Sequence, residues 1–254
     1  MAGDFLGEWQ AFRAQREARL TAPHGFLSIT GLYWLTEKRR QYDGAPGVWW
    51  LGADGVEVEL GPDEALTIDG RELRGHQVLG AVDDPGIRAT AGDVEIEVAR
   101  RDSAVLLRPR DPGHALRAGY RPTPTYPPSP DWVVRATFHP FDGERPVDDA
   151  VAEVAFTLAG EPVRLVAYDD DGGLWLVFAD ATTGRTTYGA GRQLYTPAPA
   201  ADGSLVLDFN RTINLPCAYT DYTTCPVPLP QNRLQVAIEA GEQTPAPSVA
   251  SAQQ

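Results

Sequence analysis

The 254-residue chain has few positive charges and no long apolar run. Its formal net charge is -13 and its pI is near 4.7, so it lacks the positive surface that nucleic-acid phosphates or anionic lipids require. Lys38 is the single lysine, and almost every positive charge is therefore a guanidinium group. The sequence predicts neither a nucleic-acid partner nor a membrane partner.

The sequence shows no export or membrane-insertion signal. Its first residues, "MAGDFLGEWQAFRAQREARL", lack a basic segment followed by an apolar stretch, and no span is long enough to cross a bilayer. We therefore expect a cytoplasmic location. In that compartment the two cysteines, Cys217 and Cys225, are more often reduced than bridged.

The common catalytic and metal-binding motifs are also missing. There is no G-x-S-x-G elbow, no Walker A loop and no H-E-x-x-H pair. The seven residues between Cys217 and Cys225 fit neither the redox spacing nor a zinc half-site, so we expect no metal and the cofactor stays unknown. Free thiols, a disulfide, a structural metal and a catalytic cysteine all stay open, with free thiols expected first.

The chain does contain 25 glycines and 22 prolines, which argue against a mainly helical fold. One amphipathic helix is predicted at the N-terminus, where apolar residues such as Phe5, Trp9 and Leu20 recur at helical spacing. Residues 25–35, "GFLSITGLYWL", predict a buried strand or strand pair broken at Gly31.

Short segments after Val48, in which apolar and polar residues alternate, predict antiparallel strands with one solvent-exposed face. The pair Asp69-Gly70 is the strongest hairpin signal among them. Beyond the proline-rich stretch at residues 120–132, strands recur at roughly ten-residue spacing, as in a sandwich or barrel.

The predicted fold is mainly β, an antiparallel β-barrel or sandwich with one N-terminal helix and either one or two β subdomains. We divide the chain into an N-terminal helix at 1–24, a small β-sandwich-like region at 25–118 and a larger antiparallel barrel region at 119–242. Residues 207–234 form the most polar segment of that last region, and the tail at 243–254 has a disordered composition.

Polar residues gather where the strand "SLVL" runs into a turn. If its alternation continues, Asp208 and Asn210 share the face opposite Phe209, and with Arg211 and Asn214 they would form a polar patch at a barrel mouth. The alternative is structural, because Asp and Asn side chains also cap turns and bond loop backbone.

A second polar run spans residues 178–195. Asp180 begins a predicted hairpin turn, and Tyr188 and Arg192 follow on a predicted strand interrupted by Gly189 and Gly191. If Arg192 lies near Asp208, the two would form a buried ion pair or a fork that binds carboxylates.

These two runs carry a family resemblance. "LDFNRTINLPCAYTDYTTCPVPLPQNRL" and "FADATTGRTTYGAGRQLY" resemble the signatures of a bacterial family of proteins of unknown function, numbered 1684, and the resemblance extends loosely over most of residues 8–242. The chain departs from the family pattern at Ile213, Leu215 and Leu229. The resemblance implies no activity, but it marks the positions that match its motifs: Asp180, Tyr188, Arg192, Asp208, Asn210, Arg211, Asn214, Cys217, Cys225 and Asn232.

The leading hypothesis is a cytoplasmic protein that binds a small molecule. One version of this hypothesis is an enzyme that acts on a small anionic substrate. Asp208 and Arg211 are the candidate catalytic residues, Asp208 as general base or orienting group and Arg211 as an anion-binding group. The candidate ligand-binding residues are Asp180, Tyr188, Arg192, Asn210 and Asn214. The alternative is a non-catalytic interaction or scaffold module whose signature loop is structural, and the sequence does not decide whether the chain is an enzyme.

Overall fold

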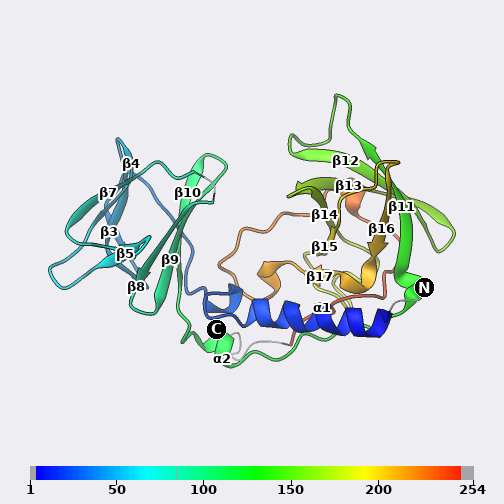
Figure 1. Cartoon of the computed structure of the whole chain (residues 1–254), viewed down its shortest axis with the longest axis horizontal. Helices are drawn as coiled ribbons and strands as arrows, with labels where there is room; N and C mark the ends of the chain where they lie inside the picture. Colours follow the sequence, from blue (N-terminus) through cyan, green and yellow to red (C-terminus); the bar gives the residue numbers. More distant parts are fainter. Residues whose placement is uncertain (1–3, 84, 247–254) are drawn as a thin grey trace. The chain divides into compact units, whose positions relative to one another are not determined.

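The computed structural model describes residues 4–83 and 85–246, which form two units with separate β cores (Figure 1). Among the described residues, the seven-stranded unit comprises residues 4–17, Arg121–Tyr219 and residues 224–246. The two-sheet unit comprises Ala18–Tyr120 and Thr220–Thr223. All three sheets are antiparallel, which confirms the predicted mainly β fold.

The predicted N-terminal helix is α1 (Phe5–Leu20). It begins after Asp4, whose side chain accepts a 2.9 Å hydrogen bond from the backbone N–H of Gly7 and so caps the first turn. The other α-helix, α2 (Ala115–Ala118), has a single turn. No helix in residues 4–83 and 85–246 is long and apolar enough to cross a membrane.

The two-sheet unit is a sandwich around one core. Its six-stranded sheet has the order β1 (Tyr33–Trp34), β10 (Ala104–Arg110), β9 (Val94–Arg101), β8 (Ile87–Ala91), β5 (Leu66–Ile68), β6 (Arg71–Leu73). Its four-stranded sheet has the order β2 (Arg40–Tyr42), β3 (Ala45–Gly52), β4 (Gly55–Glu59), β7 (His76–Gly80). Trp49 and Val58 from the small sheet and Ile96 and Leu107 from the large one are fully buried in the shared core.

The hairpin predicted at Asp69-Gly70 joins β5 to β6, with Ile68 opposite Arg71. Both turn residues have positive φ, 50° and 76°, which is the backbone that a two-residue type I′ turn requires. This part of the prediction is confirmed to the residue.

The strand predicted over residues 25–35 is largely wrong. Phe26–Ser28 forms a 3₁₀ turn, closed by a 2.7 Å hydrogen bond from the Ser28 hydroxyl to the Gly25 carbonyl, and only Tyr33–Trp34 is a strand. An apolar run indicates burial, and Leu27 and Ile29 are indeed buried, but it does not distinguish a strand from a tight turn.

The seven-stranded unit carries the two polar runs. Its sheet has the order β16 (Ser204–Asp208), β11 (Val133–Pro140), β12 (Ala150–Leu158), β13 (Glu161–Asp170), β14 (Gly173–Phe178), β15 (Arg192–Thr196), β17 (Ile213–Asn214).

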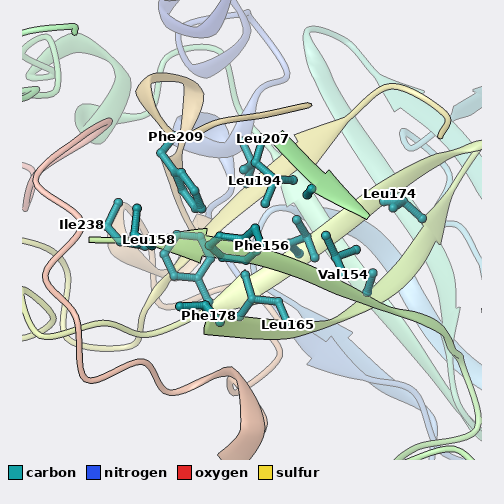
Figure 2. Close-up of a cluster of buried hydrophobic side chains, with 14 of the residues drawn as sticks. Val154, Phe156, Leu158, Leu165, Leu174, Phe178, Leu194, Leu207, Phe209 and Ile238 are labelled. Atoms are coloured by element: carbon teal, nitrogen blue, oxygen red, sulfur yellow. The ribbon is translucent and has the colours of Figure 1, made fainter. Parts of the chain in front are cut away.

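The core of the seven-stranded unit is aromatic at one end (Figure 2). The Phe209 ring lies 5.7 Å from the Phe156 ring and 5.9 Å, edge-on, from the Phe178 ring. Ile238 and Ala240 belong to the same core although they lie in no strand. The C-terminal segment therefore helps to close the core, and this positions the candidate site.

Part of the predicted tail is hydrogen-bonded to this unit. The backbone N–H of Gln243 donates to Pro124 O at 2.8 Å, and that of Thr244 donates to Thr186 O at 3.1 Å. The remainder of the predicted tail, from residue 247, lies outside the described residues.

A buried charge cluster lies on the two-sheet unit, on the face of β9 and β10 opposite the core. Arg108 donates to both oxygens of Glu97 at 2.8 and 2.7 Å, and Arg110 Nη2 donates to Glu97 Oε2 at 2.7 Å. The Glu97 side chain is 5% exposed. Burial alone would raise its pKa, but the hydrogen bonds and charge of Arg108, and then those of Arg110, outweigh burial and lower the pKa to about 2.

This lowered pKa predicts a defined acid sensitivity. Because the pKa of Glu97 is lower in the folded state, its stabilising effect is complete above the ordinary value of 4.5 and is lost as the pH falls toward about 2. We expect Glu97→Gln to reduce the free energy of unfolding by on the order of 3 kcal/mol near neutral pH, and by progressively less in acid. Urea unfolding across this pH range, with the more exposed Glu95→Gln as control, measures the difference; a pH-independent loss would contradict the assignment.

Candidate functional site

Arg192 is the most deeply buried charged residue of the predicted site. It begins β15, opposite Phe178 of β14 and Asn214 of β17, and its side chain is fully buried. Nη2 donates to Asp180 Oδ2 and to Ile238 O, both at 2.8 Å. Nη1 donates to Ala240 O and, at 3.2 Å, to Glu242 O. Arg192 thus fastens the C-terminal segment to the sheet.

The predicted pairing of Arg192 with Asp208 is wrong. The partner of Arg192 is Asp180, whose side chain is also fully buried, whereas Asp208 pairs with Arg211 at 3.1 Å. Tyr188 and Gly189 precede β15 and do not belong to it. Gly191, with φ of 97°, brings the backbone close to Phe178 O, so another strand occupies the space that its missing side chain leaves.

Asp180 organises the turn after β14. Its Oδ1 accepts hydrogen bonds from Thr182 N at 2.8 Å, Thr182 Oγ1 at 2.6 Å and Ile238 N at 3.3 Å. Because Oδ2 accepts from Arg192, both carboxylate oxygens of Asp180 are hydrogen-bonded within the chain. Asp180 therefore acts on the fold in two places, at its own turn and at the C-terminal segment.

The strand alternation predicted through Asp208, Phe209 and Asn210 does not continue. Phe209–Arg211 forms a 3₁₀ turn, so Phe209 and Asn210 are both buried. Asp208 caps this turn, because its Oδ1 accepts from Asn210 N at 3.1 Å and from Asn210 Nδ2 at 2.8 Å. The Asn210 amide also pairs with both backbone groups of Ser129 at 3.0 Å. Arg211 is the exposed member of this group, with a side chain 40% exposed.

Asn214, Tyr188 and Asn232 also bond the backbone of their own unit. Asn214 Nδ2 donates to Gln243 O at 2.8 Å, and the Tyr188 hydroxyl donates to Cys217 O at 2.8 Å. Asn232 Oδ1 accepts from Val166 N at 2.8 Å, while its Nδ2 donates to Val166 O at 2.9 Å and to Val177 O at 2.8 Å. The buried Asn232 amide therefore links β13 to β14 beyond the last residues where these strands pair directly.

The two cysteines are reduced thiols that lie together, with no disulfide between them. The backbone N–H of Cys217 contacts Cys225 Sγ at 3.2 Å. The hydrogen bond with Cys225 and burial raise the pKa of the Cys217 thiol, which opposes the thiolate that a nucleophile needs. Over the described part of the chain, no group of three or more His, Cys, Asp or Glu side chains is arranged to hold a metal ion.

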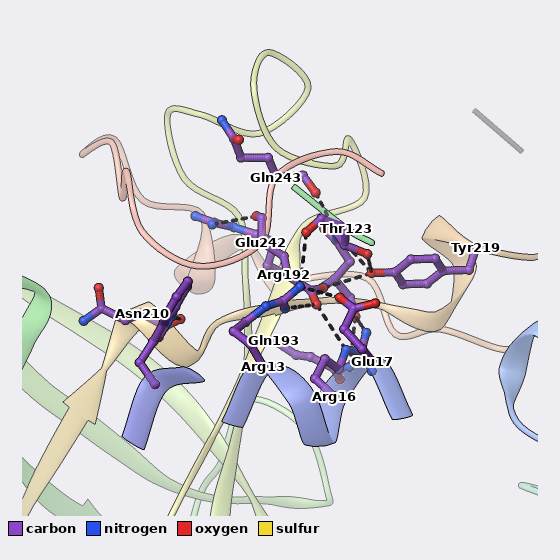
Figure 3. A network of polar contacts seen from close by, with 12 residues as sticks. Arg13, Arg16, Glu17, Thr123, Arg192, Gln193, Asn210, Tyr219, Glu242 and Gln243 are labelled. Carbon is purple, nitrogen blue, oxygen red and sulfur yellow. Dashed lines mark hydrogen bonds and ion pairs between the residues drawn. The ribbon is translucent and has the colours of Figure 1, made fainter. Parts of the chain in front are cut away.

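The centre of the polar network is Glu242, which the sequence analysis did not identify (Figure 3). Its Oε1 accepts from Arg13 Nη1 at 2.6 Å and Arg16 Nε at 3.2 Å. Its Oε2 accepts from Asn214 N at 2.7 Å and from the Tyr219 hydroxyl at 3.0 Å. The carboxylate is fully buried and bonds four donors from three separate parts of the chain.

The charges around Glu242 fix its ionisation. Burial opposes the charged form, but the charge of Arg16, the Asn214 N–H and Arg13 outweigh it and lower the pKa of Glu242. Burial and the negative charge of Glu242 raise the pKa of Tyr219 to about 12. Glu242 is therefore a carboxylate and Tyr219 a phenol at neutral pH, the protonation states that their hydrogen bond requires.

The structure thus brings the predicted site residues together in two groups. Asp180 and Arg192 form one, and Asp208, Asn210 and Arg211 form the other. No hydrogen bond or ion pair among the described residues joins these two groups directly. The sequence signal for Glu242 was weak, because it comprised two arginines three residues apart on a predicted helix and one glutamate more than 220 residues away.

Removal of the Glu242 charge is expected to destabilise the seven-stranded unit. Glu242→Gln leaves Arg13 and Arg16 without their buried counter-charge, and breaking a buried ion pair from one side costs about 3 kcal/mol or more. Urea unfolding measures this loss. Glu239→Gln makes the same change at an exposed position three residues earlier and is expected to be near neutral; equal effects of the two variants would contradict the assignment.

One family model and one solved structure match part of this chain. Residues 118–243 match the model of a family described as "Protein of unknown function (DUF1684)", a narrower span than the resemblance seen in the sequence. An uncharacterized protein from gene locus rrnAC0354 of Haloarcula marismortui, solved by solution NMR, is 32% identical over 50% of this chain and 79% of its own, with a TM-score of 0.44. The search of curated proteins gave no match. Through residues 118–243, which hold all of the signature residues described above, the chain belongs to the DUF1684 family.

Proposed function

We propose that this chain is a non-catalytic binding module, in which the DUF1684 signature builds the structure and performs no reaction. The observation that supports this most directly is that Arg192 and Asp180 make structural contacts within their own unit. Both side chains are fully buried, and they bond each other and the backbone of residues 238–242. A catalytic or ligand-binding group must be able to reach its substrate, and these two are enclosed by their own unit.

The hypothesis of a pocket for a small anionic substrate has less support. Such a pocket needs guanidinium groups that are free to form a fork on the anion. The terminal nitrogens of Arg192 donate to one carboxylate and three carbonyls instead. Asp208, the proposed base, is engaged as the cap of the turn at Phe209–Arg211.

We further propose that the module is cytoplasmic and binds its small-molecule partner outside the signature residues. The net charge of -13 favours neutral or cationic partners over anionic ones. The absence of a recognised catalytic motif from the sequence is consistent with a binding role.

If the signature residues are structural, substitutions at the more deeply buried ones should cause the larger losses of stability. Asp180→Asn uncouples a fully buried pair and is expected to lower the free energy of unfolding by about 3 kcal/mol or more. Arg211→Ala removes a half-exposed side chain and is expected to cost less than about 1 kcal/mol. The loss of unfolding free energy for Asp208→Asn should lie between these two values. The cap is weakened, but the amide oxygen of the new side chain can still accept a hydrogen bond from Asn210 N.

Urea midpoints of the three variants test this order. If Asp180→Asn and Asp208→Asn both unfold at the wild-type midpoint, the signature carboxylates do not hold the fold and the proposal fails. Native mass spectrometry of the wild-type protein adds an independent check, since a small molecule released on denaturation and lost from the Asp208→Asn or Arg211→Ala variant would place a ligand at the signature after all.

A further inference from the structure

Three aromatic side chains form a row across the outer face of the seven-stranded sheet. Tyr168 of β13 lies opposite Trp175 of β14, which lies opposite Tyr195 of β15. Neighbouring residues such as Leu174 and Leu194 point into the core, so the alternation of the strands puts the three rings on the other face. The ring centroids are 5.4 Å apart for Tyr168 and Trp175, and 6.4 Å for Trp175 and Tyr195.

Gln193 fixes two of these rings. Trp175 Nε1 donates to Gln193 Oε1 at 2.9 Å, and the Tyr195 hydroxyl donates to the same oxygen at 3.3 Å. Gln193 is buried, and its Nε2 donates to Asn214 O at 3.3 Å. The polar atoms of Trp175 and Tyr195 are therefore engaged within the unit, while Tyr195 remains 44% exposed and Trp175 partly exposed. The rings therefore form a partly exposed aromatic surface whose orientation is fixed by Gln193. The indole N–H of Trp175 is already hydrogen-bonded to Gln193.

Exposed carboxylates flank the row. Asp170 follows Tyr168 by two residues on the same strand, so it lies on the same face, and opposite it stands Gly173, which has no side chain. Asp149 immediately precedes Ala150, the residue opposite Tyr168. Burial and the charge of Asp170 raise the pKa of Tyr195, and burial and the charge of Asp149 raise that of Tyr168. Both carboxylates therefore act electrostatically on the rings.

Arg16, the cation that acts on Tyr195, is already engaged within the unit. Arg16 lowers the pKa of Tyr195, in opposition to Asp170, but its side chain is 10% exposed and bonds Glu242 and Asn214 O. The exposed part of the row thus combines aromatic surface with negative charge. An anion would be repelled there, and a neutral apolar ligand would make no use of the carboxylates.

We propose that Tyr168, Trp175 and Tyr195, with Asp149 and Asp170, bind an organic ammonium ion, a quaternary or alkylated amine. Aromatic faces attract such cations, and carboxylates beside the rings add a long-range attraction. This proposal rests on the proposed function in one respect, that the chain binds a small molecule away from the positions that match the family motifs. It adds where the molecule binds and its chemical class.

Choline chloride is the probe, and its neutral carbon isostere 3,3-dimethyl-1-butanol is the matched ligand. Saturation-transfer NMR of the methyl protons, at constant ionic strength, follows binding to the full chain. We expect choline to bind at least about tenfold more tightly than the isostere, because the two differ in charge and hardly in shape. Absence of choline binding, or equal affinity for the two compounds, overturns the proposal.

Matched variants locate the site. Tyr195→Leu removes an exposed ring and is expected to weaken choline binding at least about tenfold, whereas Tyr195→Phe keeps the ring and should retain it within about twofold. Asp170→Asn is expected to weaken binding about threefold or more. Asp169→Asn makes the same charge change on the opposite face of β13, opposite Leu174, and should leave binding unchanged.

Equal losses for Asp169→Asn and Asp170→Asn would show a general effect of net charge and overturn the site. Wild-type binding in Tyr195→Leu would do the same. Because none of these residues is among the positions that match the family motifs, failure of the choline experiments leaves the stability order of Asp180→Asn and Arg211→Ala as a separate test of the proposed function.

Discussion

The buried carboxylate of Glu242 is the interaction on which the seven-stranded unit depends. It accepts a hydrogen bond from each of four residues: two on helix α1, one in β17, and Tyr219. A buried charge is costly unless it is paired and hydrogen-bonded, so each of these segments must be in place before the carboxylate is satisfied. The requirement ties the N-terminal helix and the C-terminal segment to one position on the sheet.

The signature residues extend the same principle. Arg192, Asp180, Asn210 and Asn232 use side-chain groups to satisfy backbone atoms where strands end or separate. Buried backbone groups need partners, and irregular segments such as residues 230–242 cannot supply them by regular pairing. A dense polar signature can therefore mark the places where a β fold departs from regularity. Function in such a chain is better sought on its exposed faces.

Local patterns predicted the local structure well. The spacing of Phe5, Trp9 and Leu20 predicted α1, and Asp69-Gly70 predicted its hairpin, because both signals act within a few residues. The pairings that build the polar network could not be predicted in this way. The sequence analysis considered Asp208 as the partner of Arg192, whereas the actual partner is Asp180, and Glu242 meets Arg13 across 229 positions. Alternation also failed at Asn210, where capping by Asp208 favours a 3₁₀ turn.

Amide hydrogen exchange under native conditions tests the central claim most directly. Three backbone amides report on this network: Asn214 N–H donates to the Glu242 carboxylate, Ile238 N–H donates to the Asp180 carboxylate, and Glu242 N–H donates to Thr212 O. If the buried carboxylates of Glu242 and Asp180 hold the fold, all three amides exchange only when the seven-stranded unit unfolds, with the same opening free energy as amides in the centre of β13. Exchange of these three amides at the rate of an exposed loop, while β13 stays protected, would contradict the account.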